Sequence, residues 1–319
     1  MNKLDFYLYL NVKKLVLIYL VIVSSALHAQ QDALFTQYMY NKLEFNPAYA
    51  GSSEVFSLNM IYRFQWVGIE GAPRTFSFTV HAPLRDPHIG LGLSAYRDEL
   101  GPSVDYNVMG TFAYRIIFPS SKLCFGISGG IKYFTIDWNA LNPKDAGDIE
   151  LTSQVNNKVV PDADFGIYYY GRRYYAGLSS KHLLENQVDV SSAPSDGKLN
   201  FTRLFRHFYL MAGVVIPLSD ELVFTPSVLL KYVQNAPLQL DVNGSFVIKG
   251  ILTLGASYRT DNAIGLLMEI NLAKSLSIGY SYDIWFNALR ASNQGSHEIR
   301  LGYDFDIFGK NRMLSPRYF

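Results

Sequence analysis

The stretch VFSLNMIYRFQW at residues 55–66 decides the fold class, because large apolar side chains alternate along it with smaller or polar ones. Successive side chains of a β-strand point to opposite faces. One face would carry Phe56, Leu58, Met60, Tyr62, Phe64 and Trp66, and the other Ser57, Asn59, Ile61, Arg63 and Gln65. Soluble strands average about five or six residues, whereas a tilted strand of this length reaches roughly 30 Å, the thickness of a bilayer core. The stretch predicts a strand that crosses a membrane.

The composition agrees with a membrane protein that crosses by strands. The chain has 319 residues, of which 49% are hydrophobic and 15% aromatic but only 17% charged, against about 25% charged in ordinary globular domains. No window after residue 29 offers the uninterrupted apolar run of about eighteen residues that a spanning helix needs. The single cysteine, Cys124, excludes an intrachain disulfide and is expected to be a packing residue.

Residues 1–29 have the features of a secretory signal peptide. Lys13 and Lys14 precede the apolar run LVLIYLVIV at 15–23, and small residues follow up to Ala29. We expect cleavage after Ala29, with a cut after Ala26 as the alternative. Removing residues 1–29 leaves a nearly neutral mature chain, which gives no support for a nucleic-acid partner.

Period-two alternation predicts an all-β fold, a transmembrane antiparallel up-and-down β-barrel of about 14 strands, over residues 54–306. An even number of strands is the parity of bacterial outer-membrane barrels. The predicted strands lie near residues 54–66, 73–84, 88–98, 103–117, 121–134, 162–170, 173–181, 205–217, 221–233, 237–248, 251–260, 263–272, 275–285 and 296–306.

The connections between these strands are of two kinds. Those after even-numbered strands are short, whereas the long ones at 135–161, 182–204 and 286–295 follow odd-numbered strands. Outer-membrane barrels place short turns in the periplasm and longer loops outside, so we expect both termini to be periplasmic. Trp66, Trp138 and Trp285 each end an odd strand or follow it, which predicts three rings at the outer membrane–water boundary.

The predicted inner face is polar, and a barrel of this size is too wide for side chains alone to fill. Residues 30–53 precede the first strand as a lead-in or plug segment, in which Leu34, Phe35, Tyr38, Met39 and Leu43 recur with helical spacing. Asn46-Pro47 should end such a helix. Two positions remain open: a short helix or hook that closes the periplasmic mouth or enters the lumen, or an ordered lead-in on the outside of the barrel.

No constellation of residues predicts an enzyme, a cofactor or a metal site. The mature chain has His81, His88, His182, His207 and His297, none in a metal-ligand spacing, and they are expected to be structural. The inward carboxylates Asp164, Glu269 and Asp283 and the bases Lys132, Lys231 and Arg259 are expected to form the ordinary charged lining of a lumen. The glycines of GLGL and GISGG precede no phosphate-binding helix and are interpreted as strand glycines that permit bends or close packing.

Several sequence blocks resemble the PorP/SprF family of type IX secretion system membrane proteins. The first block is Gln37-Tyr38-Met39-Tyr40-Asn41 followed by Asn46-Pro47-Ala48-Tyr49-Ala50-Gly51-Ser52, and the second runs from Arg63 through Gln65, Trp66, Gly68, Gly71, Ala72 and Pro73 to Thr75. Further blocks are IGLGLSAYRDELGP (89–102), AYRI (113–116), FGISGGIKYF (125–134), PDADFGIYYY (161–170), YAGLSSKHLLEN (175–186), HEIRLGYDF (297–305) and SPRYF (315–319). The resemblance spans essentially the whole mature chain.

The resemblance implies an outer-membrane accessory of type IX secretion in Bacteroidota, which supports export or surface anchoring of cargo such as gliding adhesins. The implied partners are type IX secretion components, an exported cargo protein and outer-membrane lipid, with no small-molecule substrate. The alternative is a fatty-acid-type transporter or a porin. The residues expected to contact a partner or the plug are Gln37, Tyr38, Tyr40, Asn46, Pro47, Tyr49, Gly51, Arg63, Gln65 and Trp66, and Pro316, Arg317, Tyr318 and Phe319 in a periplasmic tail at 307–319.

Overall fold

The stretch that predicted the fold forms strand β1 (Phe56–Phe64) in a computed structural model that describes residues 32–137, 155–189 and 201–306. Ser57, Asn59 and Arg63 are buried on its inner face, and the large apolar side chains between them are half-buried on its outer face. The alternation therefore separates a polar interior from an apolar exterior, as the sequence predicts.

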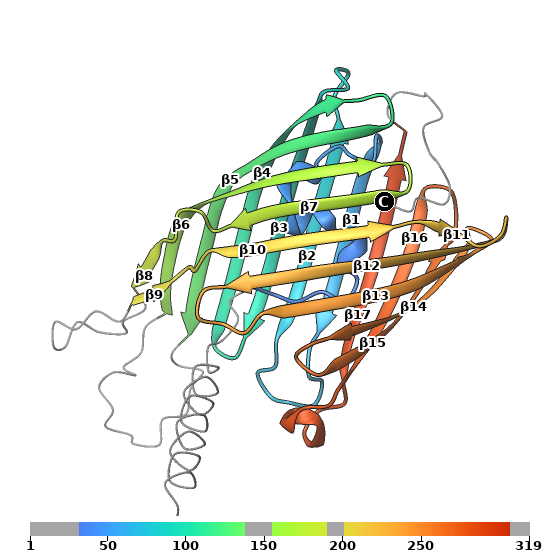
Figure 1. Cartoon of the computed structure of the whole chain (residues 1–319). Helices are drawn as coiled ribbons and strands as arrows, with labels where there is room; N and C mark the ends of the chain where they lie inside the picture. Colours follow the sequence, from blue (N-terminus) through green and yellow to red (C-terminus); the bar gives the residue numbers. More distant parts are fainter. Residues whose placement is uncertain (1–31, 138–154, 190–200, 307–319) are drawn as a thin grey trace, which may run out of the picture.

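Antiparallel strands form a closed wall (Figure 1). The first strand of the wall, β1, pairs with the last strand, β17. On the other side of the barrel, β10 pairs with β12, which closes the ring. Because β10 and β11 both pair with β12 and are separated only by Val215, they form one interrupted strand, and the wall has 14 strands. The remaining strands are β2 (Arg74–Pro83), β3 (Ile89–Leu100), β4 (Ser103–Ile117), β5 (Ser121–Asp137), β6 (Val155–Gly171), β7 (Tyr174–Lys181), β10 (His207–Val214), β11 (Ile216–Pro217), β12 (Leu222–Val233), β13 (Gln239–Ile248), β14 (Leu252–Arg259), β15 (Ala263–Asn271), β16 (Leu276–Trp285) and β17 (Ser296–Phe305).

Two predicted long loops contain more structure than the sequence indicated. β6 begins at Val155 and pairs with β5 as far as Asp137, so both ends of the loop predicted at 135–161 are strand, and residues 138–154 between them lie outside the described residues. Hydrogen bonds from β5 outweigh the poor strand propensity of Asn156 and Pro161. The segment predicted as a loop at 182–204 carries a hairpin of β8 (Gln187–Asp189) and β9 (Phe201–Arg203), which lies at the end of β6, β7 and β10 in Figure 1.

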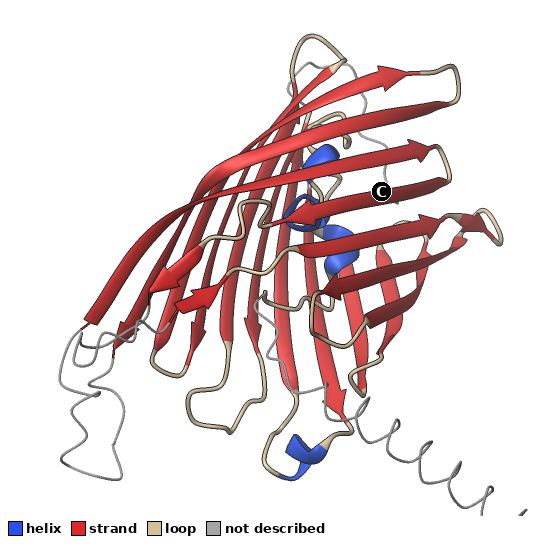
Figure 2. Cartoon of the chain, turned by 60° about the vertical axis from the view of Figure 1, so that its left-hand side comes forward, coloured by secondary structure: helices blue, strands red, loops and turns tan. Residues whose placement is uncertain are grey.

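Residues 32–55, which we call the plug, lie inside the barrel. They form three short turns of helix, η1 (Tyr38–Tyr40), α2 (Lys42–Phe45) and η2 (Pro47–Tyr49), and Figure 2 shows these helices surrounded by the wall. The helix ends at Phe45, directly before Asn46-Pro47. Since Asn46, Ala48 and Ala50 are fully buried and touch inward-facing wall residues, the plug occupies the lumen rather than the outside of the wall.

The plug runs along the lumen from one end of the barrel to the other. Near its start, the Tyr209 hydroxyl donates to Asp32 at 3.1 Å, at the end where the long loops emerge. Near its finish, the Gly51 amide donates to His81 Nδ1 at 3.2 Å, close to the short turn that follows β2. Residues 1–31 and 307–319 lie outside the described residues, so the predicted signal peptide, periplasmic termini and C-terminal tail remain predictions.

Apolar packing in the interior is concentrated between the plug and the wall. Phe35, Leu43 and Phe45 of the plug form one buried cluster with wall residues such as Tyr209 and Met211. The Phe45 ring meets the Tyr209 ring edge-on, with 5.4 Å between centroids. Within the described residues, no helix combines the length and the apolar character needed to cross a bilayer.

Candidate functional site: the plug and the lumen wall

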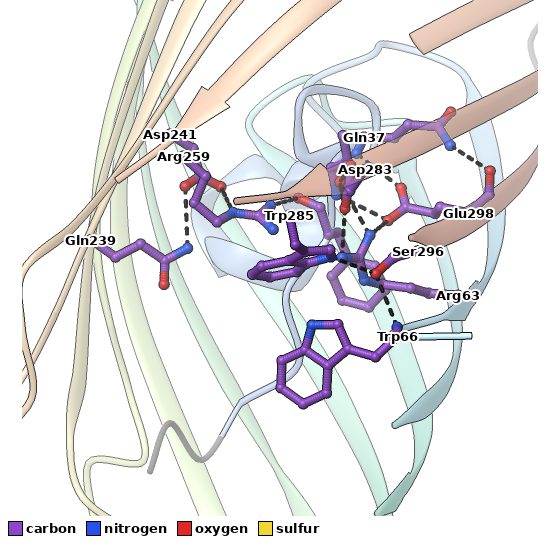
Figure 3. Close-up of polar contacts among 12 residues, drawn as sticks. Gln37, Arg63, Trp66, Gln239, Asp241, Arg259, Asp283, Trp285, Ser296 and Glu298 are labelled. Atoms are coloured by element: carbon purple, nitrogen blue, oxygen red, sulfur yellow. Dashed lines mark hydrogen bonds and ion pairs between the residues drawn. The ribbon is translucent and has the colours of Figure 1, made fainter. Parts of the chain in front are cut away.

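Arg63 anchors the plug at the long-loop end of the lumen. Its guanidinium group contacts Asp283 Oδ2 at 2.6 Å and Glu298 Oε2 at 3.0 Å, and all three side chains are almost fully buried. Arg63 and Glu298 stand opposite each other on the paired strands β1 and β17, and Figure 3 shows the Arg63 guanidinium group directed at both carboxylates. Because a buried charge is tolerated only when it is paired and hydrogen-bonded, the three groups depend on one another.

The plug completes this network with its main chain. The amides of Thr36 and Gln37 each donate to a Glu298 oxygen at 2.9 Å, one to Oε2 and the other to Oε1. The Thr36 hydroxyl donates to Asp283 at 2.7 Å and accepts from Arg63 Nη1 at 3.1 Å. The plug and the wall therefore share one hydrogen-bonded network in the lumen.

A second ion pair supports the plug nearby. Arg259 Nε donates to Asp241 Oδ2 at 2.9 Å, and Gln239 Nε2 donates to the other Asp241 oxygen at 3.1 Å. Arg259 Nη2 also donates to the Phe35 carbonyl oxygen at 3.4 Å. Figure 3 shows this pair on the left and Arg63 on the right. The charges predicted to line the lumen thus also hold the plug.

The Asn46-Pro47 turn fixes the plug to β6 and β7. Asn46 Nδ2 donates to the carbonyl oxygens of Ile167 at 3.0 Å and Leu178 at 3.3 Å, and its Oδ1 accepts from the Ala48 amide at 2.9 Å. Pro47 occupies the first position of η2, where its missing N–H costs nothing. Asparagine supplies both the helix cap and the donors that two wall carbonyls need.

Glycines of the wall make room for this turn. A Cβ atom at Gly126 would lie 2.2 Å from the Ala48 nitrogen, and one at Gly166 would lie 2.1 Å from Asn46 Oδ1. A Cβ atom at Gly90 would lie 2.1 Å from the Ala50 carbonyl oxygen. No residue other than glycine fits at these positions while the plug is in place. The sequence interpretation of close packing holds here, and the partner is the plug.

The other predicted plug residues also contact the wall. The Tyr38 hydroxyl lies 3.0 Å from Ser227 Oγ, and the Tyr40 ring stacks under the Arg300 guanidinium group with 4.7 Å between Cζ and the ring centroid. The Tyr49 ring packs edge-on against His81 and Tyr168. Gln37 Nε2 donates to the Glu298 carbonyl oxygen at 3.4 Å.

Lys42 is a buried cation of the plug. Its Nζ donates to the Met39 carbonyl oxygen at 2.6 Å and lies over the rings of Tyr49 and Tyr175. Burial, together with the charge of Arg300, lowers the pKa of the Lys42 ammonium group to about 7. It also lines a polar cavity of about 110 Å³ between the plug and the wall.

The structure corrects the expectation for the tryptophans. Trp285 is buried and directed into the lumen, where its Nε1 donates to Ser296 Oγ at 2.8 Å. The Trp66 ring packs against the Trp285 ring at 5.6 Å, and the Trp66 amide donates to the same Ser296 oxygen. β1 ends at Phe64 and Trp66 has a φ of 51°, so it leaves the outer face. These two rings are not part of a lipid-facing belt, and Trp138 lies outside the described residues.

The remaining predicted residues occupy different environments. Gln65 is half-buried and lines a hollow beside the loop between β1 and β2. Its main-chain amide donates to the Pro73 carbonyl oxygen. Asp283 and Glu269, expected to line the lumen, form ion pairs with Arg63 and Arg300. The residues from Pro316 to Phe319 lie outside the described residues.

Sequence reasoning missed one group altogether. His182 and His207, expected to be isolated, lie side by side with 5.3 Å between ring centroids and face Asp32 of the plug. The signal was available, because the two histidines flank one loop between strands that must pair, and His207 stands opposite Lys181 in the ladder.

The fold and this site define a membrane β-barrel whose lumen is filled by its own N-terminal segment. The family described as type IX secretion system membrane protein PorP/SprF matches residues 27–303. The chain therefore belongs to the PorP/SprF family, which associates it with type IX secretion and with the outer membrane. This family is not one of enzymes.

Among curated protein sequences, none is significantly similar to this chain. Comparison with solved structures finds the CymD monoaromatic hydrocarbon channel, with a TM-score of 0.48, 11% identity, and coverage of 88% of this chain and 95% of that chain. The P. putida toluene transporter TodX matches with a TM-score of 0.46, 10% identity, and coverage of 82% and 93%. Acinetobacter baumannii Omp33 matches with a TM-score of 0.45, 7% identity, and coverage of 79% and 100%. Similarities of this size say nothing about function.

Proposed function

We propose that the protein is a non-enzymatic accessory of type IX secretion that binds exported cargo at the long-loop end of a plugged barrel. The observation that carries the proposal is the plug, which is fixed by buried ion pairs and by contacts at wall glycines. A lumen filled in this way favours binding at the barrel surface over passage through it. Gln65 and Trp66 belong to the rim of that surface, and Arg63 supports it from inside.

The hairpin of β8 and β9 is the part of this surface most suited to binding. It extends from the wall at the end of β7 and β10 (Figure 1), and its base is held by an ion pair of 2.8 Å between Arg203 and Glu185. Leu184 beside it is about half exposed. Exposed loops on a rigid scaffold are common sites of recognition.

The alternative functions are a transporter of hydrophobic small molecules and a porin. A hydrophobic molecule needs an apolar pocket, whereas the cavity beside Lys42 is lined by polar groups such as Asn59, Glu269 and Arg300. A porin needs an open channel. Conductance in planar bilayers separates these functions, because large steady currents through the wild-type barrel would favour a porin and silence favours the accessory.

Loop replacement tests the binding proposal. A strain whose only copy carries a short Gly-Ser link in place of Gln187–Arg203 should lose surface display of a type IX cargo, measured by antibody labelling of intact cells. A matched variant, with Ser219–Glu221 of a short turn replaced, should keep it. Both barrels should reach normal abundance in the outer membrane. Full cargo display by the hairpin variant would contradict the proposal.

We propose that both termini face the periplasm and that the tail at 307–319 docks on a periplasmic component of the machine. The support is its basic and aromatic sequence, with Arg317, Tyr318 and Phe319 at the end. Truncation after Phe308 should reduce co-purification of secretion components while the barrel still inserts. Unchanged co-purification would end the docking proposal.

A further inference from the structure

Where the plug begins, three side chains converge on one point of the lumen. Asp32 Oδ1 lies 2.9 Å from His182 Nε2, and Asp32 Oδ2 lies 3.6 Å from His207 Nδ1. One ligand-capable atom from each of the three residues lies within 4.8 Å of the others. A tetrahedral ion with ligands at about 2 Å holds its ligand atoms about 3.3 Å apart, so small side-chain shifts would close this shell.

His207 supplies an independent indication of a ligand. Its side chain has no exposed surface, yet neither ring nitrogen has a hydrogen-bond partner. A buried polar group without a partner is costly, and native proteins rarely keep one without a reason. Since Nδ1 already faces Asp32, a bound cation would satisfy this nitrogen.

The surroundings of His182 are those of a metal ligand. Its Nδ1 lies 2.5 Å from Asp162 Oδ2, and its main-chain amide donates to Asp164 at 3.1 Å. A carboxylate on the far nitrogen of a ligating histidine fixes the ring and strengthens the bond to the metal. Here that carboxylate leaves Nε2 directed at Asp32.

The local charge also suits a divalent cation. Asp32, Asp162, Asp164 and Glu44 carry negative charge here. Lys181 opposes them, 3.2 Å from Glu44 and 4.0 Å from Asp32, and Lys231 donates to the Asp32 carbonyl oxygen at 3.4 Å. With neutral histidines, four carboxylates and two ammonium groups leave two negative charges, which a divalent ion neutralises.

We propose that Asp32, His182 and His207 bind a divalent transition metal ion of the Zn²⁺ class, with Asp162 as the residue that positions His182. Two imidazoles and a carboxylate are ligands that suit zinc and its neighbours. Because Asp32 belongs to the plug and both histidines to the wall, the ion links the plug to the barrel. This site goes beyond the proposed accessory function and does not depend on it.

Metal analysis of the purified mature barrel in detergent tests the site. The protein is stripped with a chelator, equilibrated with Zn²⁺, desalted and analysed by mass spectrometry of metal content. We expect about one zinc per chain in the parent and in His297→Ala, and at least a tenfold lower content in His207→Phe and in Asp32→Asn. His207→Phe keeps a ring beside Tyr209, and Asp162→Asn should give an intermediate content.

Insertion of every variant is checked by the heat-dependent shift in gel mobility that folded barrels show. Folded His207→Phe or Asp32→Asn with the zinc content of the parent would overturn the proposal, as would a parent that retains no zinc. Should both variants fail to insert, the site is tested by amide exchange of the parent protein with and without zinc. Zinc must then slow amide exchange in the plug at residues 33–37 relative to the stripped protein, and equal rates would also overturn the site.

Discussion

The plug is held mainly by hydrogen bonds and ion pairs at the end of the barrel where the long loops emerge, and mainly by close packing at the end with the short turns. At the first end, Arg63 joins two buried carboxylates and two plug amides. At the second, the turn at Asn46 lies against glycines where even a methyl group would collide with the plug backbone. Polar networks tolerate replacement when all partners change together, whereas a backbone contact tolerates no added atom. The two ends should therefore fail in different ways.

The largest effect is expected from filling the glycine contact. Gly126→Val places a side chain on the backbone of Ala48, so the plug must leave its seat. We expect steady ion currents through this variant in planar bilayers, where the parent is silent. Gly129→Val is the matched control, because this glycine of the same strand is exposed and has no atom within 4 Å of its Cβ position. Equal silence from both variants would show that Gly126 does not seat the plug.

The second largest effect is expected from removing the positive charge of Arg63, which should destabilise the barrel. Arg63→Met leaves Asp283 and Glu298 buried without their counter-charge, which typically costs about 3–5 kcal/mol. Urea unfolding followed by tryptophan fluorescence measures this loss, because Trp66 and Trp285 pack beside each other close to the site.

A triple variant distinguishes the charge network from simple packing. Replacing Arg63, Asp283 and Glu298 by Met, Asn and Gln removes all three charges at once. We expect it to regain more than half of the stability lost by Arg63→Met. A triple variant that is less stable than the single one would refute the comparison between the two ends.

A smaller loss is expected at the Asn46 turn. Asn46→Ala removes the cap of Ala48 and the donors to two wall carbonyls, each worth about 1 kcal/mol. The same urea titration should show a loss of about 1–3 kcal/mol. Stability equal to the parent would mean that the glycine contacts alone hold this end.

The last expected effect is a dependence of stability on pH. The pKa of Lys42 is about 7 in the docked plug but near 10.4 in an unfolded chain. Folding therefore releases a proton between these values, and stability should rise as the pH increases from 7 to 9. Lys42→Met should remove this component. The difference between the two urea titrations at each pH checks it, and identical pH dependence would contradict it.

The sequence predicted the wall well because alternation is a local property. Every predicted strand is present, since each face of a strand sees one constant environment, lipid or lumen. It failed at Asn156 to Pro161, where pairing with β5 overrides poor local propensity. It also failed at Trp285, whose parity places it with Asp283 on the inner face.

The candidate site was predictable only in part, because it depends on contacts between distant segments. The polar inner face and the conspicuous turn at Asn46-Pro47 were visible in the sequence. The inward glycines were visible too, but nothing local shows that Gly126 and Gly166 face the same turn. Glu298, which accepts from the Thr36 amide, and His182, which contacts Asp32, lie 262 and 150 residues away along the chain, beyond any periodic pattern.

Hydrogen exchange in the purified barrel tests most directly whether the N-terminal segment fills the lumen. We expect amides of residues 36–50 to exchange about as slowly as those of β1 and β17, because Glu298 and other buried groups hold them. Exchange of this segment within seconds, in a barrel whose strands stay protected, would contradict the account.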